Sequence, residues 1–424
     1  MDCPGYRILF DVLLWMVFLA FLPKNYHIKG TGFGVFNQTP SKEIYLPNYD
    51  FYHNLSQLNQ CIYELVSQFP NILDAEMRFR SRWGLSQYVL HFGNLSESKT
   101  SSTRKVRILL SFGEHSSEYL PVESMLYLLK NLTSGIREPF GSASFNFTRF
   151  VMENIDLYLI GIFNPDGRSV IEKTKNYCWI KTGSGADLNL HQYGSRSSVT
   201  RQMLVEPECR VLTELTSLLH FDVFISFHSG EENILVPFRD FDSVPRNLLH
   251  PDNMEILSLA HHLSSSTPNG LKHIQMNQSL NHYGESIFSY TSMTREIPYV
   301  YVISLWKNTK HVRKDQNNCF ARSNPQSSKL QEVLKSFHPV YNSLFKYMVK
   351  WKKTKLKSIA EKKKIKTIHP LSNSYGISFI IVISIVLLLM TRINLPLGWR
   401  LFYRRQRRIV SLRSLSSVFS FFIF

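Results

Sequence analysis

Cysteine and clustered charge are both scarce in most of this 424-residue chain, and each scarcity excludes a class of protein. There are five cysteines and no C-x-x-C pair, which excludes a cysteine-bound metal of the zinc-finger kind. Residues 1–345 carry 32 basic and 31 acidic side chains, so this part is close to neutral. Because phosphate binding needs an excess of Lys and Arg, the neutral body excludes nucleic acid as the main partner.

The basic excess of the chain lies in its last part. Residues 346–424 hold 17 of the 49 Lys and Arg residues and a single acid, Glu361. Within them Tyr375–Thr391 has no charge over 17 residues, which is the lower limit for a helix that spans a bilayer. Lysines precede this stretch and arginines follow it, an arrangement typical of membrane helices and rare around buried ones. We predict a basic juxtamembrane segment at 346–370, a transmembrane helix at 371–391, and a basic cytosolic tail at 392–424.

A second apolar run, Ile8–Leu22, lies close to the N-terminus. It resembles the apolar region of a signal peptide, although Asp11 interrupts it and no small-residue cleavage site follows. Residues 1–24 are therefore either a signal peptide or a signal anchor, and residues 25–49 form a leader. Both alternatives place the body, residues 50–345, in the lumen or outside the cell.

Glycosylation triplets and cysteines fit that location. Six N-x-S/T triplets occur, and this pattern is the acceptor for N-glycans in secreted proteins. Four cysteines in the body permit up to two disulfides, in three possible pairings. We therefore predict the secretory pathway or the cell-surface membrane. The triplets begin at Asn37, Asn54, Asn94, Asn131, Asn146 and Asn277, and the cysteines are Cys61, Cys178, Cys209 and Cys319.

Strand and helix patterns alternate along the body. Short runs rich in β-branched and aromatic residues are separated by segments with apolar residues at helical spacing. This alternation predicts an α/β sheet covered by helices on both faces. The predicted strands are 87–92, 106–112, 154–163, 221–228 and 298–306, the predicted helices are 54–70, 121–132, 206–220 and 330–348, and NPDG at 164–167 is a predicted turn.

Polar residues that could carry chemistry stand at the ends of three of these strands, one of which is strand 154–163 with NPDG after it. His115 and Glu118 stand three apart just after strand 106–112, and His228 ends the strand 221–228. Open α/β sheets place their sites at the carboxyl ends of strands.

At these positions the sequence resembles the zinc carboxypeptidases of the carboxypeptidase A/B type. The resemblance implies that family's fold, a mixed β-sheet flanked by helices, and its reaction, the hydrolysis of C-terminal residues from peptides and proteins. It implies one zinc ion held by His115, Glu118 and His228. The matching pieces occur in the family's order and are H-x-x-E at 115–118, NPDG at 164–167, GADLN at 185–189, EPE at 206–208, HS at 228–229 and IPY at 297–299.

Three positions of the family's reaction machinery carry uncharged residues here. The family has an oxyanion-stabilising Arg where this chain has Ile180, and an Arg that grips the substrate carboxylate where it has Leu190. Ser304 stands where the family has the Glu that activates the attacking water. An oxyanion donor stabilises the transition state by about 3–4 kcal/mol, and a general base contributes typically 10²–10⁴-fold. The resemblance therefore predicts a zinc-binding protein whose catalysis is impaired.

An active membrane-bound zinc carboxypeptidase that uses atypical residues is the alternative. Glu231, three residues after His228, is the candidate for a replacement base. In either case the resemblance implies that Asn189 and Tyr283 contact the substrate. The partners it implies are peptide or protein C-termini, and the apolar segments imply a membrane.

Overall fold

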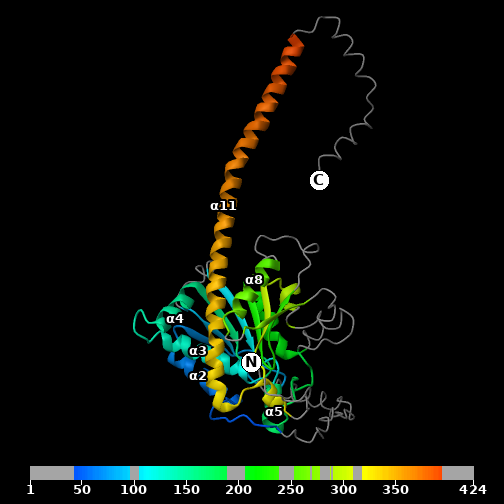
Figure 1. The fold of residues 1–424 in the computed structure, drawn as a ribbon. Helices are drawn as coiled ribbons and strands as arrows, with labels where there is room; N and C mark the ends of the chain where they lie inside the picture. The colour runs from blue at the N-terminus through cyan, green and yellow to red at the C-terminus, as the bar shows by residue number, and fades with distance from the viewer. Residues whose placement is uncertain are drawn as a thin grey trace, which may run out of the picture.

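A computed structural model describes residues 43–95, 105–188, 206–237, 253–267, 270–276, 287, 290–308 and 318–393. Within these residues the chain folds around one eight-stranded sheet in the order β1-β2-β4-β3-β5-β8-β6-β7 (Figure 1). The strands are β1 (Leu73–Glu76), β2 (Val89–Phe92), β3 (Val106–Phe112), β4 (Ile155–Ile160), β5 (Val223–His228), β6 (Glu232–Pro237), β7 (Lys272–Met276) and β8 (Tyr299–Leu305).

The sheet is mixed, as the sequence predicts. Its four central strands, β4, β3, β5 and β8, run parallel to one another. The pairs β1–β2, β2–β4 and β6–β8 are antiparallel, whereas β6 and β7 are parallel. All six residues of β5 are buried, since parallel strands in the middle of a sheet are covered on both faces.

Helices cover both faces because successive residues of each strand point to opposite sides. On β3, Ile108 and Leu110 belong to the core under α3, α8 and the first part of α11, and Leu109 belongs to the core under α7. Buried apolar side chains of the strands and helices fill both cores. The helices are α2 (Leu55–Gln68), α3 (Leu120–Gly135), α4 (Ala143–Asn154), α5 (Pro165–Thr174), α7 (Arg210–Leu218), α8 (Asn253–Ser264), α10 (Cys319–Ser323) and α11 (Leu330–Ile393).

Two local predictions differ from the structure. NPDG is the start of helix α5 and not a free turn, because the Asn164 side chain accepts a hydrogen bond from the backbone N–H of Gly167 and Pro165 takes the first helical position. The predicted helix 206–220 begins as a short 3₁₀ turn at Pro207–Cys209, and regular α-helix starts only at Arg210.

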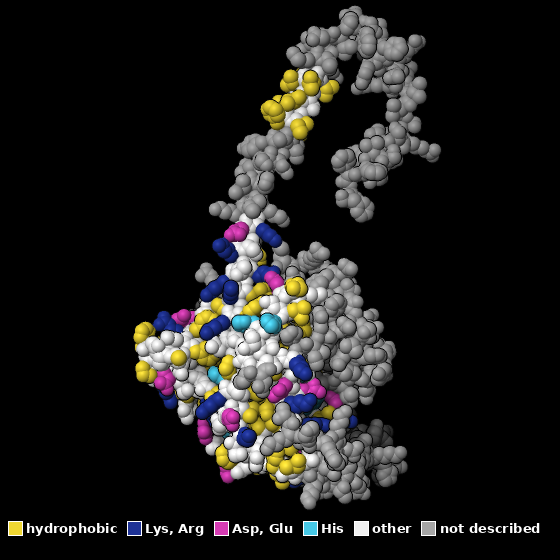
Figure 2. All heavy atoms as spheres, viewed as in Figure 1, with side chains coloured by type: hydrophobic (Ala, Val, Ile, Leu, Met, Phe, Trp, Pro, Cys, Tyr) yellow, Lys and Arg dark blue, Asp and Glu magenta, His cyan; other side chains and the backbone are white. Residues whose placement is uncertain are grey.

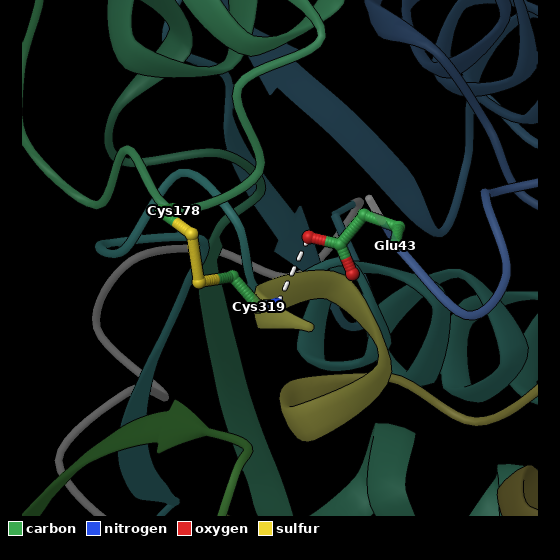
Figure 3. Close-up of side chains that lie close together, drawn as sticks. All are labelled: Glu43, Cys178 and Cys319. Atoms are coloured by element: carbon green, nitrogen blue, oxygen red, sulfur yellow. Dashed lines mark hydrogen bonds between the residues drawn. A yellow bond between two sulfur atoms is a disulfide. The ribbon is translucent and has the colours of Figure 1, made fainter. Parts of the chain in front are cut away.

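One disulfide joins two distant parts of the body. Cys178 and Cys319, which are 141 residues apart, are bonded, while Cys61 and the buried Cys209 are free. Figure 3 shows Glu43 beside this bond, where its carboxylate accepts a hydrogen bond from the backbone N–H of Cys319. The structure thus contains one of the two disulfides that four cysteines permit.

The last described helix includes the predicted juxtamembrane and membrane segments. Helix α11 runs without a break from the body through residues 346–370 and 371–391 (Figure 1). Its distal part exposes apolar side chains between Phe379 and Leu389 (Figure 2). In the part of the chain that the structure describes, however, no helix is long and apolar enough to cross a membrane. The predicted transmembrane helix is therefore not confirmed.

Candidate metal centre

The loop that follows β3 brings the first two predicted ligands to the edge of the sheet. The chain turns at Gly113, whose φ of +69° favours glycine, and a Cβ there would lie 3.1 Å from Cγ2 of Val122. His115 and Glu118 then lie in the loop ahead of α3. Parallel strands end at the same edge of a sheet, so this loop reaches the end of the neighbouring strand β5, where His228 is the last residue.

The three predicted ligands converge on one point. Oε1 of Glu118 lies 2.8 Å from Nδ1 of His115, and its Oε2 lies 3.0 Å from Nδ1 of His228. Oε2 also accepts a hydrogen bond of 3.0 Å from the backbone N–H of Ser229. The two imidazole rings lie 4.7 Å apart, centroid to centroid. Each histidine therefore turns the same ring nitrogen, Nδ1, toward the carboxylate.

This geometry fits a small divalent metal ion. One ligand atom from each of the three residues lies within 4.8 Å of the other two. A tetrahedral zinc ion places its ligand atoms roughly 3.3 Å apart, given bonds of about 2.0 Å. His115 is partly accessible while Glu118 and His228 are buried, so one side of the group is open. Two imidazoles and one carboxylate are the donor set of a catalytic zinc site, which also needs an accessible side for a fourth ligand.

The charged groups in this cluster shift one another's pKa values. Burial opposes ionisation of Glu118, but the neighbouring His115 and His228 outweigh it and lower the pKa of this carboxyl to about 2. Burial likewise disfavours the charged form of His228, but Glu118 and Glu114 outweigh it and raise its pKa to about 10. In the metal-free protein the histidine thus supplies positive charge that a bound cation would replace.

The NPDG piece holds the ligand loop in place. The Asn164 side chain donates hydrogen bonds to the backbone carbonyls of Glu114 and Lys181, at 3.1 and 3.0 Å. Arg168, fully buried on α5, donates to the carbonyls of Ser116 and Glu118, at 2.9 and 3.1 Å. Four carbonyls of neighbouring loops are thereby fixed from one helix N-terminus, which limits the movement of the ligand loop.

The segment with Ile180 lies against the same loop. The backbone N–H of Ser116 donates to the carbonyl of Ile180 at 3.3 Å, and its hydroxyl donates to the carbonyl of Trp179 at 2.6 Å. From the GADLN piece, Oδ1 of Asp187 lies 4.0 Å from Nε2 of His115. The sequence motif brings these residues to the predicted site, as its order along the chain indicates.

Ser304 lies beside the last ligand. In the parallel pairing of β5 with β8 it stands directly opposite His228. Its hydroxyl accepts a hydrogen bond of 3.3 Å from the backbone N–H of Glu231, while the exposed Glu231 side chain accepts one of 2.5 Å from Asn233. The candidate replacement base is therefore held next to the serine by its backbone, with its carboxylate engaged by Asn233.

Other predicted residues lie outside the described residues or serve the scaffold. Asn189, Leu190 and Tyr283 are not described. Glu208 of the EPE piece is buried and accepts a hydrogen bond from the backbone N–H of Arg82. Sequence reasoning missed one acid at the centre, Glu114. Its signal was visible, because a charged residue directly before a ligand histidine at a buried strand end is unusual.

Comparisons with known proteins find relatives over much of the body. A family model described as zinc carboxypeptidase matches residues 58–333. Carboxypeptidase A1 of Rattus norvegicus is 26% identical over 235 residues, which are 50% of this chain and 52% of that protein, and carboxypeptidase A2 of the same species is 24% identical over 212 residues, 45% and 48% of the two chains. The chain thus spans about half the length of these relatives.

Solved structures show the same fold. The crystal structure of thrombin activatable fibrinolysis inhibitor superposes with a TM-score of 0.55 and 18% identity, covering 71% of this chain and 75% of that one. Carboxypeptidase A from Helicoverpa armigera gives a TM-score of 0.55 with 17% identity and the same coverage.

Proposed function

Because this chain belongs to the zinc carboxypeptidase family, we propose that its body binds one zinc ion and hydrolyses peptide bonds poorly or not at all. The ligands are His115, Glu118 and His228, whose donor atoms already converge. When bound, zinc supplies the positive charge that polarises a substrate carbonyl. The remaining steps of hydrolysis depend on residues of the chain.

The observation that carries the proposal is the position of Ser304. It stands beside His228 in the sheet, at the place that the family resemblance assigns to the general base. A serine hydroxyl cannot take up a proton at neutral pH, so it cannot activate water. Ile180 also brings no charge to the loop that its backbone contacts, and an apolar side chain cannot stabilise an oxyanion.

Peptide or protein C-termini are the proposed ligands of this site. The resemblance supports this class, and a zinc ion beside a partly accessible His115 offers a place for a carboxylate or a carbonyl. We place the body in an oxidising compartment, in the lumen or outside the cell, and the Cys178–Cys319 disulfide supports that placement.

Restoring the family's charges tests the proposal. Zinc-loaded protein carrying Ser304→Glu, Ile180→Arg and Leu190→Arg together should release C-terminal residues from peptides, whereas wild-type protein should not exceed a zinc-free control. Each single change should recover little, because the residues of a catalytic unit act together. Ser304→Gln in the same triple background is the matched control, since it has the size of the glutamate without its basicity. Equal activity of the two triple variants would contradict the assignment of Ser304.

Glu231 supports a second candidate function, an active carboxypeptidase with a displaced base. Its backbone N–H donates to the hydroxyl of Ser304, which brings it near the residue at the family's base position, although its carboxylate accepts from Asn233. If Glu231 acts as the general base, wild-type protein releases C-terminal residues from peptides. Glu231→Gln should then lower kcat by about 10²–10⁴-fold at unchanged zinc content. Glu232→Gln, one residue further along, is the control and should leave kcat unchanged.

A further inference from the structure

Glu114 is a buried acid that the reaction of the family does not require. Its side chain is almost completely buried, with 1% of its surface exposed. Oε1 accepts hydrogen bonds from the hydroxyls of Ser111, at 2.8 Å, and Ser226, at 2.7 Å. Oε2 lies 3.2 Å from Nε2 of His228, on the side of the ring opposite to Glu118.

The sheet builds this arrangement from adjacent strands. Ser111 on β3 and Ser226 on β5 are paired in register, so both hydroxyls lie side by side on the same face. Ser226 and His228 are two apart on one strand and also share that face. The chain turns at Gly113, and this turn places the carboxylate of Glu114 next to the two serine hydroxyls.

The hydrogen bonds determine which nitrogen of His228 carries a proton. The single proton of the Ser226 hydroxyl is donated to Glu114, so its oxygen can only accept from Nε2, 2.9 Å away. The carboxylate of Glu114 also accepts. Two acceptors around Nε2 keep a proton on that atom, so a metal ion would take the place of the proton that Nδ1 holds toward Glu118.

We propose that Glu114 is a positioning residue of the metal centre, which holds the ring of His228 through Nε2 so that Nδ1 faces the zinc ion. This inference rests on the proposed zinc site. A carboxylate bonded to the second ring nitrogen fixes the orientation and tautomer of a ligand histidine and makes it a better donor, which increases metal affinity.

Zinc affinity is the first test. Wild-type full-length protein and Glu114→Gln are titrated against a chromophoric chelator of known zinc affinity, with folding checked by circular dichroism. Glu114→Gln keeps the shape and loses the charge, and we expect zinc to bind about 10–100-fold more weakly, as for other residues that support a metal ligand. Glu123→Gln is the matched control, because Glu123 is also a buried acid bonded to a histidine, His53, at 2.7 Å. It should leave zinc affinity unchanged.

The ring of His228 provides a second test that needs no variant at Glu114. In zinc-loaded wild-type protein with ¹⁵N-labelled histidine, this ring should be protonated at Nε2 and bound to the metal through Nδ1, with His228→Gln identifying its signals. A proton on Nδ1 overturns the inference, and so does equal zinc affinity of the wild type and Glu114→Gln. Wild-type protein that binds no zinc at all overturns the proposed function itself, which is a distinct result.

Discussion

The two halves of the candidate site differ in how completely they keep charged residues. The half that faces the metal has two histidines and a carboxylate within hydrogen-bonding distance, a further buried acid behind them, and serines that orient that acid. In the half where the family carries its reacting groups, Ser304 and Ile180 are uncharged. Under the proposed function, this chain would bind the metal without carrying out hydrolysis.

Different physical demands explain how the halves can diverge. The loop that carries two of the metal ligands is held by hydrogen bonds from Arg168 on α5. Removing one charged member of a buried cluster leaves the remaining charges without a partner, which is destabilising. The residues that stabilise a transition state have no such ties, because their partner is a transient species. Replacing a reacting group should therefore change the stability of the fold little, whereas removing a member of the buried cluster should destabilise it.

The largest effect should follow from breaking the metal half. His115→Ala with His228→Ala removes two of the three protein ligands, so zinc should fall from about one ion per chain to none. Metal analysis by mass spectrometry on dialysed protein measures this directly. His91→Ala is the control, since His91 stacks on Tyr158 away from the cluster and should leave zinc content unchanged. Retention of zinc by the double variant would show that other residues bind it.

A smaller effect is expected from the disulfide next to the altered half. Cys178 directly precedes Trp179 and Ile180, whose carbonyls contact the ligand loop. Replacing Cys178 and its partner Cys319 by serine should lower the free energy of unfolding by about 2–5 kcal/mol, as is typical for loss of a native disulfide. Urea unfolding of oxidised protein checks this. Cys61→Ser should have a much smaller effect, because that cysteine is free.

The smallest effect concerns a carboxylate–histidine pair outside both halves. Contact with Cys61 and the bond to Glu123 outweigh burial and raise the pKa of His53 to about 9. A raised histidine pKa stabilises the fold fully below the unfolded value of about 6.5, and this stabilisation is lost as pH rises through 9. The difference in unfolding free energy between wild type and His53→Gln should therefore be on the order of 1 kcal/mol larger at pH 6 than at pH 10. A constant difference would exclude this linkage.

Much of the fold was predictable because its signals are local. The run VRILLSF has the apolar, β-branched composition of a central strand, and the structure places β3 on those residues. The capping effect of Asn164 was not predictable as a helix start, because NPDG is equally typical of a turn. The Cys178–Cys319 pairing depends on two loops meeting across 141 residues, which spacing alone cannot determine.

The site shows the same limit. His115, Glu118 and His228 were predictable as a group because the family resemblance implies them, and their positions at strand ends, which meet at one edge of the sheet, agree with it. Glu114 was missed because its role depends on Ser111 and Ser226, whose alignment is set by the register of β3 with β5. Its partners come from two strands more than 100 residues apart, so the sequence shows an unusual acid but not the contacts that define its role.

Turnover by wild-type protein of known zinc content tests the central claim most directly. Purified full-length protein is analysed for zinc and, in the same preparation, incubated with peptides that have free C-termini while released amino acids are measured. We predict about one zinc ion per chain and no release above a zinc-depleted control. Release of C-terminal residues that disappears in His115→Ala would contradict the account, because it would show that the uncharged half of the site still supports hydrolysis.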